Sequence, residues 1–422
     1  MVKETIIPAG YKKTEVGVIP NNWEVIDVGK ITEFHKQGYY TKESYKDNGK
    51  YFLLRGTDMQ NPRIDLTTTP RIDANDIDYS NYKVQKGDVL IVRSGAIGRY
   101  GIVEKIPDSI FGSYLINFRL NQRKILNVFF GYFYESEHAI KQLKTITQGS
   151  SNININAENI KALKIPFPPT KEEQIAITSP LGDVDALITS LEKLITKKRN
   201  IKQAAMQQLL TGKKRLPGFS GEWEKARLGD ESELITKGTT PTSLGREFKD
   251  NGINFIKIES LEENGNIIIE KIAFIDEETH KLLRRSQLKE KDILISIAGA
   301  LGRIAIVKIE ILQANTNQAL ALVRLKQQTK LDLSYLFYFL NSSQIKSHIN
   351  AINVQAAQAN LSLENINDFE IRFPQLPEQT AIAQILSDMD SELKAMEQKR
   401  DKYIALKQGM MQELLTGKTR LV

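Results

Sequence analysis

Short patterns of charged and polar residues are the first place to look for catalytic chemistry in this chain. Residues 247–249 and 392–394 have the Glu-x-Lys spacing of nuclease cores, but neither follows a strand that carries a suitable Asp. The "TGKT" at 416–419 resembles the end of a phosphate-binding P-loop, yet the first glycine of that motif is missing. These patterns therefore predict neither a nuclease centre nor a nucleotide site.

Other candidate motifs are also incomplete. The four histidines are scattered, and none has the spacing of a metal site. The G-x-x-G-R segments at 95–99 and 299–303 lack the third glycine and the acidic residue of a dinucleotide fold, so a tight turn between strands is favoured. The "FPPT" at 167–170 lacks the amide or acid of an amino-methyltransferase motif. We therefore expect a binding protein with no catalytic residue, no metal and no cofactor.

The bulk composition is that of a soluble globular protein. Its 422 residues suggest two or three domains, and the absence of cysteine excludes disulfides and thiolate metal sites. No apolar run is long enough for a membrane span, and the first residues lack the apolar core of a signal peptide, so we expect a cytoplasmic protein with no membrane partner. The net charge of +7 favours a polyanionic partner such as nucleic acid. A basic protein without such a partner fits the charge equally well.

The elements that must position any site are duplicated. Residues 169–216 align with 374–421 without a gap, and 21 of the 48 positions are identical. About three identities are expected between unrelated segments of ordinary composition. The repeat is too long for a solenoid unit. The chain therefore contains two copies of one domain-sized plan.

Each copy ends in a predicted helix of about 40 residues, or about 60 Å. Its apolar positions step by three and four, which is a heptad pattern interrupted by basic residues at matching places. In the first copy the positions are Leu181, Val184, Ile188, Leu191, Ile195, Lys198, Lys202, Ala205 and Leu209. In the second they are Leu386, Met389, Leu393, Met396, Arg400, Tyr403, Lys407, Met410 and Leu414.

The only other long apolar stripe available to each predicted helix is that of its copy. If the halves are related by a pseudo-twofold axis, the two helices run antiparallel as a coiled coil; a core helix in a larger bundle is the alternative. Lys202 and Lys407 either fix the register of the pair or extend to solvent.

The remaining segments predict two related globular domains of mixed strands and short helices, so the fold class is α+β. "DVLIVRSGAIGRYGIV" (88–103) parallels "DILISIAGALGRIAIV" (292–307), and Trp23 and Trp223 open the two domains. The domain loops match poorly, which suggests a shared scaffold with two different binding surfaces. The predicted division is domain one at 1–168, helix one at 169–212, domain two at 213–373, helix two at 374–417 and a basic tail at 418–422.

Together these features resemble the specificity subunit of type I restriction–modification systems. The resemblance rests on "GYKKTEVGVIPNNWEV", the central "QLLTGKKRLPGFSGEWE", the repeated "P…EQ" before a long helix, and the terminal "LLTGKTRL". It covers essentially the whole chain. It implies two target recognition domains spaced by an antiparallel coiled coil, and a bipartite DNA site. It also implies two adenine methyltransferase subunits and ATP-dependent restriction subunits as partners.

The resemblance directs attention to loops whose side chains could enter the major groove of DNA. The loop after the opening strand of each domain, the polar loop before each long helix, and matching basic positions on the strands are the candidates. In domain one the predicted DNA-binding residues are Lys36, Gln37, Tyr39, Tyr40, Arg55, Arg99, Gln148, Ser150, Ser151 and Asn152. In domain two they are Lys237, Thr239, Thr240, Thr242, Lys257, Arg303, Gln355, Gln358 and Asn360.

We expect the helix surfaces and the "EQ" pairs to contact the methyltransferase subunits. The residues of these pairs are Glu173, Gln174, Glu378 and Gln379. One alternative function is a scaffold that bridges two protein partners and never binds DNA. Another is a nuclease with its own catalytic centre, which the missing motifs disfavour.

Overall fold

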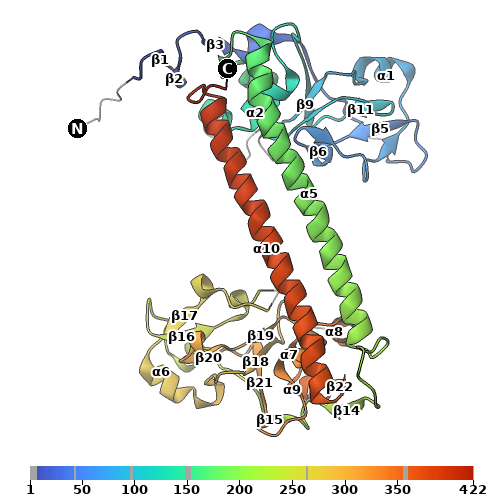
Figure 1. The fold of residues 1–422 in the computed structure, drawn as a ribbon, viewed down its shortest axis with the longest axis vertical. Helices are drawn as coiled ribbons and strands as arrows, with labels where there is room; N and C mark the ends of the chain where they lie inside the picture. The colour runs from blue at the N-terminus through green and yellow to red at the C-terminus, as the bar shows by residue number, and fades with distance from the viewer. Residues whose placement is uncertain are drawn as a thin grey trace. The chain divides into compact units, whose positions relative to one another are not determined.

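The computed structural model describes six stretches of the chain: 7–41, 44–95, 98–147, 154–262, 265–354 and 360–421. It divides into two compact units, and both long helices pass from one unit into the other (Figure 1). Unit 1 comprises 1–192 and 398–422, and unit 2 comprises 193–397. Each unit therefore contains one globular domain with a part of each long helix.

The elements of unit 1 follow the mixed order expected from the sequence. They are β1 (Tyr11–Thr14), β2 (Gly17–Pro20), β3 (Glu24–Asp27), β4 (Thr32–Gln37), β5 (Tyr51–Leu54), β6 (Met59–Gln60), β7 (Arg63–Ile64), β8 (Arg71–Ile72), α1 (Asp76–Tyr82), β9 (Val89–Val92), β10 (Tyr100–Ile102), β11 (Ser109–Phe111), β12 (Leu115–Leu120), α2 (Asn127–Glu135), α3 (Glu137–Ile146), α4 (Ala157–Lys161), β13 (Lys164–Phe167) and the first part of α5 (Lys171–Leu209).

The elements of unit 2 repeat much of this order. They are β14 (Glu224–Arg227), β15 (Ser232–Lys237), β16 (Ile253–Ile256), β17 (Ala273–Ile275), α6 (Glu277–Leu282), β18 (Ile293–Ser296), β19 (Ile304–Ile306), β20 (Ala314–Thr316), β21 (Leu320–Leu325), α7 (Leu333–Leu340), α8 (Ser343–Val354), α9 (Leu363–Asn367), β22 (Glu370–Phe373) and the first part of α10 (Leu376–Leu414).

The two domains are built on the same pair of sheets. Domain one has a four-stranded antiparallel sheet, β10-β9-β12-β4, and a three-stranded sheet, β11-β5-β8. Domain two has β19-β18-β21-β15 and β17-β16-β20 in the same places. The central strands β9 and β18 are buried along their whole length, because both of their faces are covered. The predicted α+β class and the duplication of the domain are confirmed.

The predicted heptad pattern is confirmed by burial. Every position assigned to the pattern in α5 and α10 is buried or half-buried, and Leu181 and Leu386 are fully buried in the cores. In unit 2, Lys198 of α5 pairs with Glu392 of α10, and Lys202, further along α5, pairs with Asp390, which comes earlier in α10. The two helices therefore run antiparallel within this unit.

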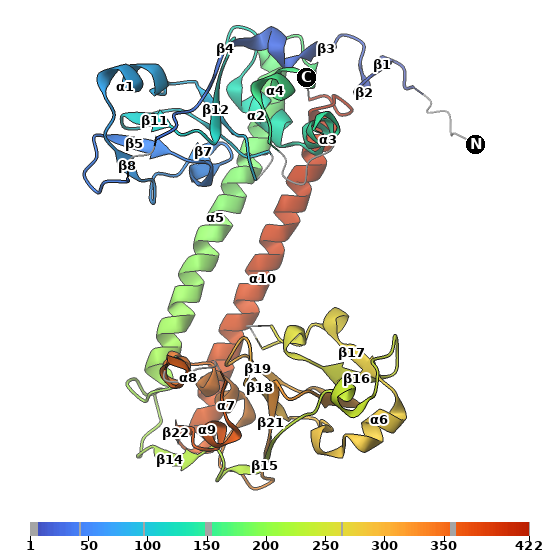
Figure 2. The same cartoon turned by 180° about the vertical axis from the view of Figure 1, so that it is seen from behind.

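The domains pack directly on the long helices. In unit 1, Phe129 and Phe130 of α2 share one core with Leu181 of α5 and Leu414 of α10. The start of α5 and the end of α10 lie side by side here in both views (Figure 2). Pro180 lies inside α5 and removes one helical hydrogen bond, an interruption that the heptad pattern does not indicate. Among the described residues, no helix combines the length and apolar character needed to cross a membrane.

In unit 2, Lys202 is held by a carboxylate and a ring. Its ammonium contacts Asp390 of α10 at 2.5 Å, and that carboxylate also accepts a hydrogen bond of 2.9 Å from the Tyr338 hydroxyl. The ammonium lies 5.5 Å from the centre of the Tyr338 ring, within cation–π range. Tyr338 of domain two therefore contacts Lys202 of α5 and Asp390 of α10 in one polar cluster.

In unit 1, Lys407 makes the equivalent set of contacts. Its ammonium contacts Asp185 of α5 at 2.8 Å, and Asp185 accepts a hydrogen bond of 2.8 Å from the Tyr132 hydroxyl. The Tyr132 ring centre lies 5.1 Å from the ammonium. These contacts decide between the two roles left open for Lys202 and Lys407: each side chain is paired across the helices and does not extend freely to solvent.

Candidate nucleic-acid interface

In domain one, the predicted loops converge on one edge of the four-stranded sheet. β4 ends where β12 begins, because Gln37 pairs with Ile116, and the Tyr39 amide donates to the Phe111 carbonyl. On the other side of β12, the Arg93 amide donates to the Tyr114 carbonyl. This edge, which comprises 37–41, 93–95, 98–99 and 112–114, is called the domain-one edge below.

The polar loop before α5 meets the same edge. Ser94 forms an isolated bridge with Asn154, and the Ile155 amide donates to the Arg93 carbonyl at 2.8 Å. Arg55 follows β5, whose last residue bonds to the Gly112 amide. Segments separated by more than 100 residues in the sequence are therefore brought together by strand register alone.

Domain two builds the same edge from matching segments. Lys237 at the end of β15 pairs with Ala321 of β21, and the Ile297 amide donates to the Ala319 carbonyl. Ala298 forms an isolated bridge with Asn360. The segments 237–242, 297–299, 302–303, 317–319 and 360 make up the domain-two edge.

A glycine lets the first loop cross each edge. A Cβ atom at Gly38 would lie 2.1 Å from the Gly112 carbonyl oxygen, and one at Gly238 would lie 1.7 Å from that of Thr316. No side chain fits at these distances, so the backbone of the loop lies directly against the neighbouring strand end. This requirement explains a glycine at the same place in two otherwise dissimilar loops.

Several predicted residues are committed to contacts within their own domain. Arg55 pairs with the buried Asp58 at 2.9 Å and donates to the Thr68 carbonyl, which makes it a support for the loop. The Lys36 ammonium donates to the Asn81 carbonyl and lies over the Tyr82 ring. The further committed residues are Tyr39, hydrogen-bonded to Asp78; Thr239, within reach of Arg285; Thr240, bonded to Gln318; Lys257, over the Phe248 ring; and Arg303, bonded to the Leu261 carbonyl.

Other predicted residues are exposed at the edges. Tyr40 is 71% exposed, and Gln37, Lys237, Thr242 and Asn360 are also open to solvent. The Arg99 side chain makes no hydrogen bond or ion pair with any described residue and lines a cavity beside α10. The remaining predicted residues lie outside the described stretches: Gln148, Ser150, Ser151, Asn152, Gln355 and Gln358. Their assignment stays a prediction.

The structure adds residues that the sequence analysis missed. Tyr114 is 67% exposed between β11 and β12, and Gln318 is exposed at the matching turn of domain two. Arg93 follows β9, and its Nε atom is buried without a partner among the described residues. The aligned residue in domain two is Ile297. The repeat alignment contains a signal for Arg93, because it stands opposite Ile297 within the related segments 88–103 and 292–307.

The glutamines of the "EQ" pairs lie inside the fold. Gln174 accepts a hydrogen bond from the Leu126 amide at 2.8 Å and donates to the Lys124 carbonyl at 3.0 Å. Gln379 accepts a hydrogen bond of 2.8 Å from the amide of Asp332, just before α7, and donates one of 2.9 Å to the Lys330 carbonyl. Both side chains are buried and connect the first turn of a long helix to the domain helix that packs on it.

The glutamates of the same pairs are buried as well. Glu173 is paired with Arg420 at 2.8 Å, and Glu378 with Arg215 at 2.6 Å. Each arginine belongs to the segment that follows the other long helix. The prediction that these four residues contact partner proteins stays a prediction, but their side chains present almost no free surface. Their internal bonds account for the identity of the "EQ" positions in the repeat.

Replacing Gln379 by Ala is expected to lower the free energy of unfolding of unit 2 by about 1–3 kcal/mol. The substitution removes the bonds of Gln379 to the part-buried Asp332 amide and to the carbonyls of Lys330 and Pro374, and the groups left without a partner lower the stability. Urea unfolding followed by tryptophan fluorescence measures the change. The neighbouring exposed Gln375 provides the control, since its replacement by Ala should change the stability by less than about 0.5 kcal/mol. Equal effects of the two substitutions would contradict the structural role.

No resident metal site is indicated in the part of the chain that the structure describes. No group of three or more His, Asp or Glu side chains there could hold an ion. Glu392, from one of the Glu-x-Lys patterns, is paired with Lys198 on the neighbouring helix. What the two edges offer is exposed amide, hydroxyl, aromatic and basic side chains, which are the groups that recognise nucleic-acid bases and phosphates.

Comparison with known proteins agrees with this geometry. A family model described as "Type I restriction modification DNA specificity domain" matches residues 20–203 and again 220–404. A protein of Methanocaldococcus jannaschii, given the name type I restriction enzyme MjaX specificity subunit, is 29% identical and the match covers 97% of each chain.

Two solved structures share the fold. A chain from a structure that describes complex assembly and conformational transition of the type I R-M system has a TM-score of 0.58 at 17% identity, covering 95% of this chain and 99% of that one. The S subunit of a type I restriction-modification system from M. genitalium has a TM-score of 0.55 at 16% identity, covering 93% and 96%. With a family-model match in each half, the chain belongs to the type I restriction–modification DNA specificity family, whose members supply sequence specificity rather than catalysis.

Proposed function

We propose that this chain reads a bipartite, asymmetric site in double-stranded DNA, with one domain on each half-site. The observation that carries the proposal is the pair of matching sheet edges with different side chains. Domain one has the half-buried Arg93 and the exposed Tyr114 where domain two has the buried Ile297 and the exposed Gln318. Two identical edges would suit a palindrome, whereas these edges suit two different sequences.

The charge of the chain supports a DNA partner. A net charge of +7 favours contacts with phosphates, which would make the affinity fall steeply as the salt concentration rises. A scaffold that only bridges two proteins would show neither this salt dependence nor a sequence preference. The family membership does not favour the scaffold.

We further propose that two methyltransferase subunits and the restriction subunits assemble on this chain, in the cytoplasm where they meet chromosomal DNA. Exposed apolar residues at matching places on the long helices support two equivalent docking positions. Ile201 of α5 is 44% exposed in unit 2, and Leu406 of α10, at the same position of the repeat, is 50% exposed in unit 1. These residues are better candidates for partner contact than the buried "EQ" pairs.

Alanine substitutions at the edges test which residues read the bases. We expect Tyr40→Ala with Tyr114→Ala to relax only the half-site of domain one, and Thr242→Ala with Gln318→Ala to relax only that of domain two. Each lost base contact should reduce discrimination by about 1–3 kcal/mol. Methylation-aware sequencing of DNA from cells that contain the complete system measures both half-sites at once.

A control variant separates base reading from general damage. Lys225→Ala changes an exposed residue of β14 that lies away from the domain-two edge and pairs with Glu370. It should leave both half-sites unchanged. If the edge substitutions also left both half-sites unchanged, the assignment of the edges would be wrong.

A further inference from the structure

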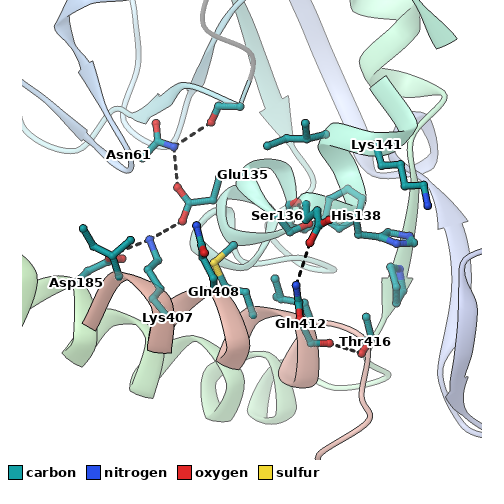
Figure 3. Close-up of a pocket in the computed structure, with 18 of the residues that line it drawn as sticks. Asn61, Glu135, Ser136, His138, Lys141, Asp185, Lys407, Gln408, Gln412 and Thr416 are labelled. Carbon is teal, nitrogen blue, oxygen red and sulfur yellow. Dashed lines mark hydrogen bonds and ion pairs between the residues drawn. The ribbon is translucent and has the colours of Figure 1, made fainter. Parts of the chain in front are cut away.

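Unit 1 contains a buried carboxylate that has no counterpart in unit 2. Glu135 closes helix α2, and its side chain is only 13% exposed. One carboxylate oxygen contacts the Lys407 ammonium at 2.6 Å, and the other accepts a hydrogen bond of 2.6 Å from the Asn61 side-chain amide (Figure 3). Lys407 therefore has two carboxylate partners, Asp185 and Glu135.

Asn61 connects this carboxylate to the domain-one edge. Its amide nitrogen also donates to the Gly98 carbonyl at 2.9 Å, and its oxygen accepts from the Tyr100 amide at 2.9 Å. Its backbone amide donates to the Tyr100 carbonyl. Arg99 lies between these two residues, so its backbone is held on both sides by one asparagine. The Arg99 side chain lines the cavity of about 950 Å³ in which Glu135 and Lys407 also lie.

Unit 2 fixes the arginine that corresponds to Arg99 without a buried carboxylate. The residue aligned with Glu135 is Asn341, whose amide donates to the Phe337 carbonyl of its own helix at 3.0 Å. Arg303, the counterpart of Arg99, is fixed directly by a bond of 3.1 Å to the Leu261 carbonyl. The buried carboxylate, Glu135, is thus found in unit 1, where the Arg99 side chain makes no hydrogen bond or ion pair with a described residue.

The electrostatics do not suggest that Glu135 serves stability. Burial raises the pKa of Glu135, and the hydrogen bonds and charge of Lys407 only partly oppose this effect. An acid whose pKa is raised by folding stabilises the fold below its unfolded pKa, and that contribution is lost as the pH rises. At neutral pH the ionised Glu135 is therefore less favourable in the fold than the protonated acid would be.

We propose that Glu135 is a positioning residue for sequence recognition by domain one. It holds Asn61, and through Asn61 the Gly98–Tyr100 turn, against Lys407 of α10, so that Arg99 is presented to DNA from a fixed backbone. The inference rests on the proposed function, and it assigns a role in half-site preference to a residue that is too deeply buried to read bases itself.

The test compares Glu135→Ala with substitutions of its two neighbours in the complete system. Glu135→Ala and Asn61→Ala should each reduce discrimination at one or more positions of the domain-one half-site about tenfold or more. The other half-site and the spacing should be unchanged. The double variant should be no worse than Asn61→Ala, because both residues act through one chain of contacts. Glu135→Gln, which keeps an oxygen acceptor for Asn61, should retain more of the preference than Glu135→Ala.

Tyr132→Phe is the matched structural control. It removes the hydrogen bond to Asp185 in the same junction but leaves Glu135 and Asn61 in contact. It should lower the urea midpoint of unit 1 without relaxing either half-site, whereas Glu135→Gln should not lower that midpoint. An unchanged domain-one preference in Glu135→Ala, or equal relaxation of both half-sites, would overturn the inference. Failure of the proposed function is distinguishable, since the unmodified system would then show no bipartite preference at all.

Discussion

Deletion of one heptad from each long helix is expected to shorten the gap between the two recognised DNA tracts by about three base pairs. Residues 190–196 and 395–401 are the deletions to make, because they correspond in the repeat and their removal keeps both heptad patterns in phase. Seven helical residues rise by about 10 Å. A base pair of B-DNA rises by about 3.4 Å, so the loss amounts to about three base pairs.

The original site should lose its methylation in the deletion variant, and a site with the same two tracts and a shorter gap should gain it. Duplication of the same heptads gives the complementary test, with a gap about three base pairs longer. The sequences of the tracts should be unchanged in both variants, because neither domain is altered. Methylation at the original spacing in either variant would contradict the idea that helix length sets the spacing.

Replacement of Lys407 by Met is expected to destabilise unit 1 far more than Lys202→Met destabilises unit 2. Lys407→Met removes the shared cation and leaves Glu135 and Asp185 facing each other, at 13% and 23% exposure. We expect a cost of about 2–4 kcal/mol, somewhat below that of breaking a fully buried pair. Lys202→Met leaves only Asp390 without its cation. This carboxylate is 43% exposed and can be hydrated, so the expected cost is about 1 kcal/mol or less.

The two tryptophans allow each unit to be followed separately. The chain has two, Trp23 in unit 1 and Trp223 in unit 2, so replacing either one by Phe leaves a single fluorescent reporter. Lys407→Met should shift the urea transition reported by Trp23, and Lys202→Met that reported by Trp223. The cost of Lys407→Met should fall when Glu135 is first changed to Gln, because one of the stranded charges is then absent. Equal costs for the two lysines would show that the second carboxylate has no energetic role.

Much of this architecture is predictable because it is repeated and periodic. The heptad positions from Leu181 to Leu414 follow from a spacing that recurs over many turns, and burial confirms them. The duplicated sheets follow from matching runs of Val and Ile. Lys202 and Lys407 stand out in the sequence as matching interruptions of the pattern, but their aspartate and tyrosine partners do not, since these come from distant segments.

The parts that escaped prediction depend on single contacts between distant residues. Nothing in the local sequence shows that Gln379 bonds to the backbone before α7, so its occurrence in the repeat favours a surface role. Arg55 gives no local indication that Asp58 and the Thr68 carbonyl hold its guanidinium. Glu135 belongs to no motif and is not repeated as an acid in unit 2, and only the fold places it between Asn61 and Lys407. Convergence of the loops at each edge depends on strand register, which composition does not determine.

Methylation-aware sequencing of DNA from cells that carry this chain with its methyltransferase and restriction partners is the most direct test of two different reading edges. We predict methylated adenines in one site composed of two short, dissimilar tracts at a constant spacing, and loss of that pattern when this chain is removed. A palindromic site, a single continuous tract, or a methylation pattern that does not depend on this chain would contradict the central claim.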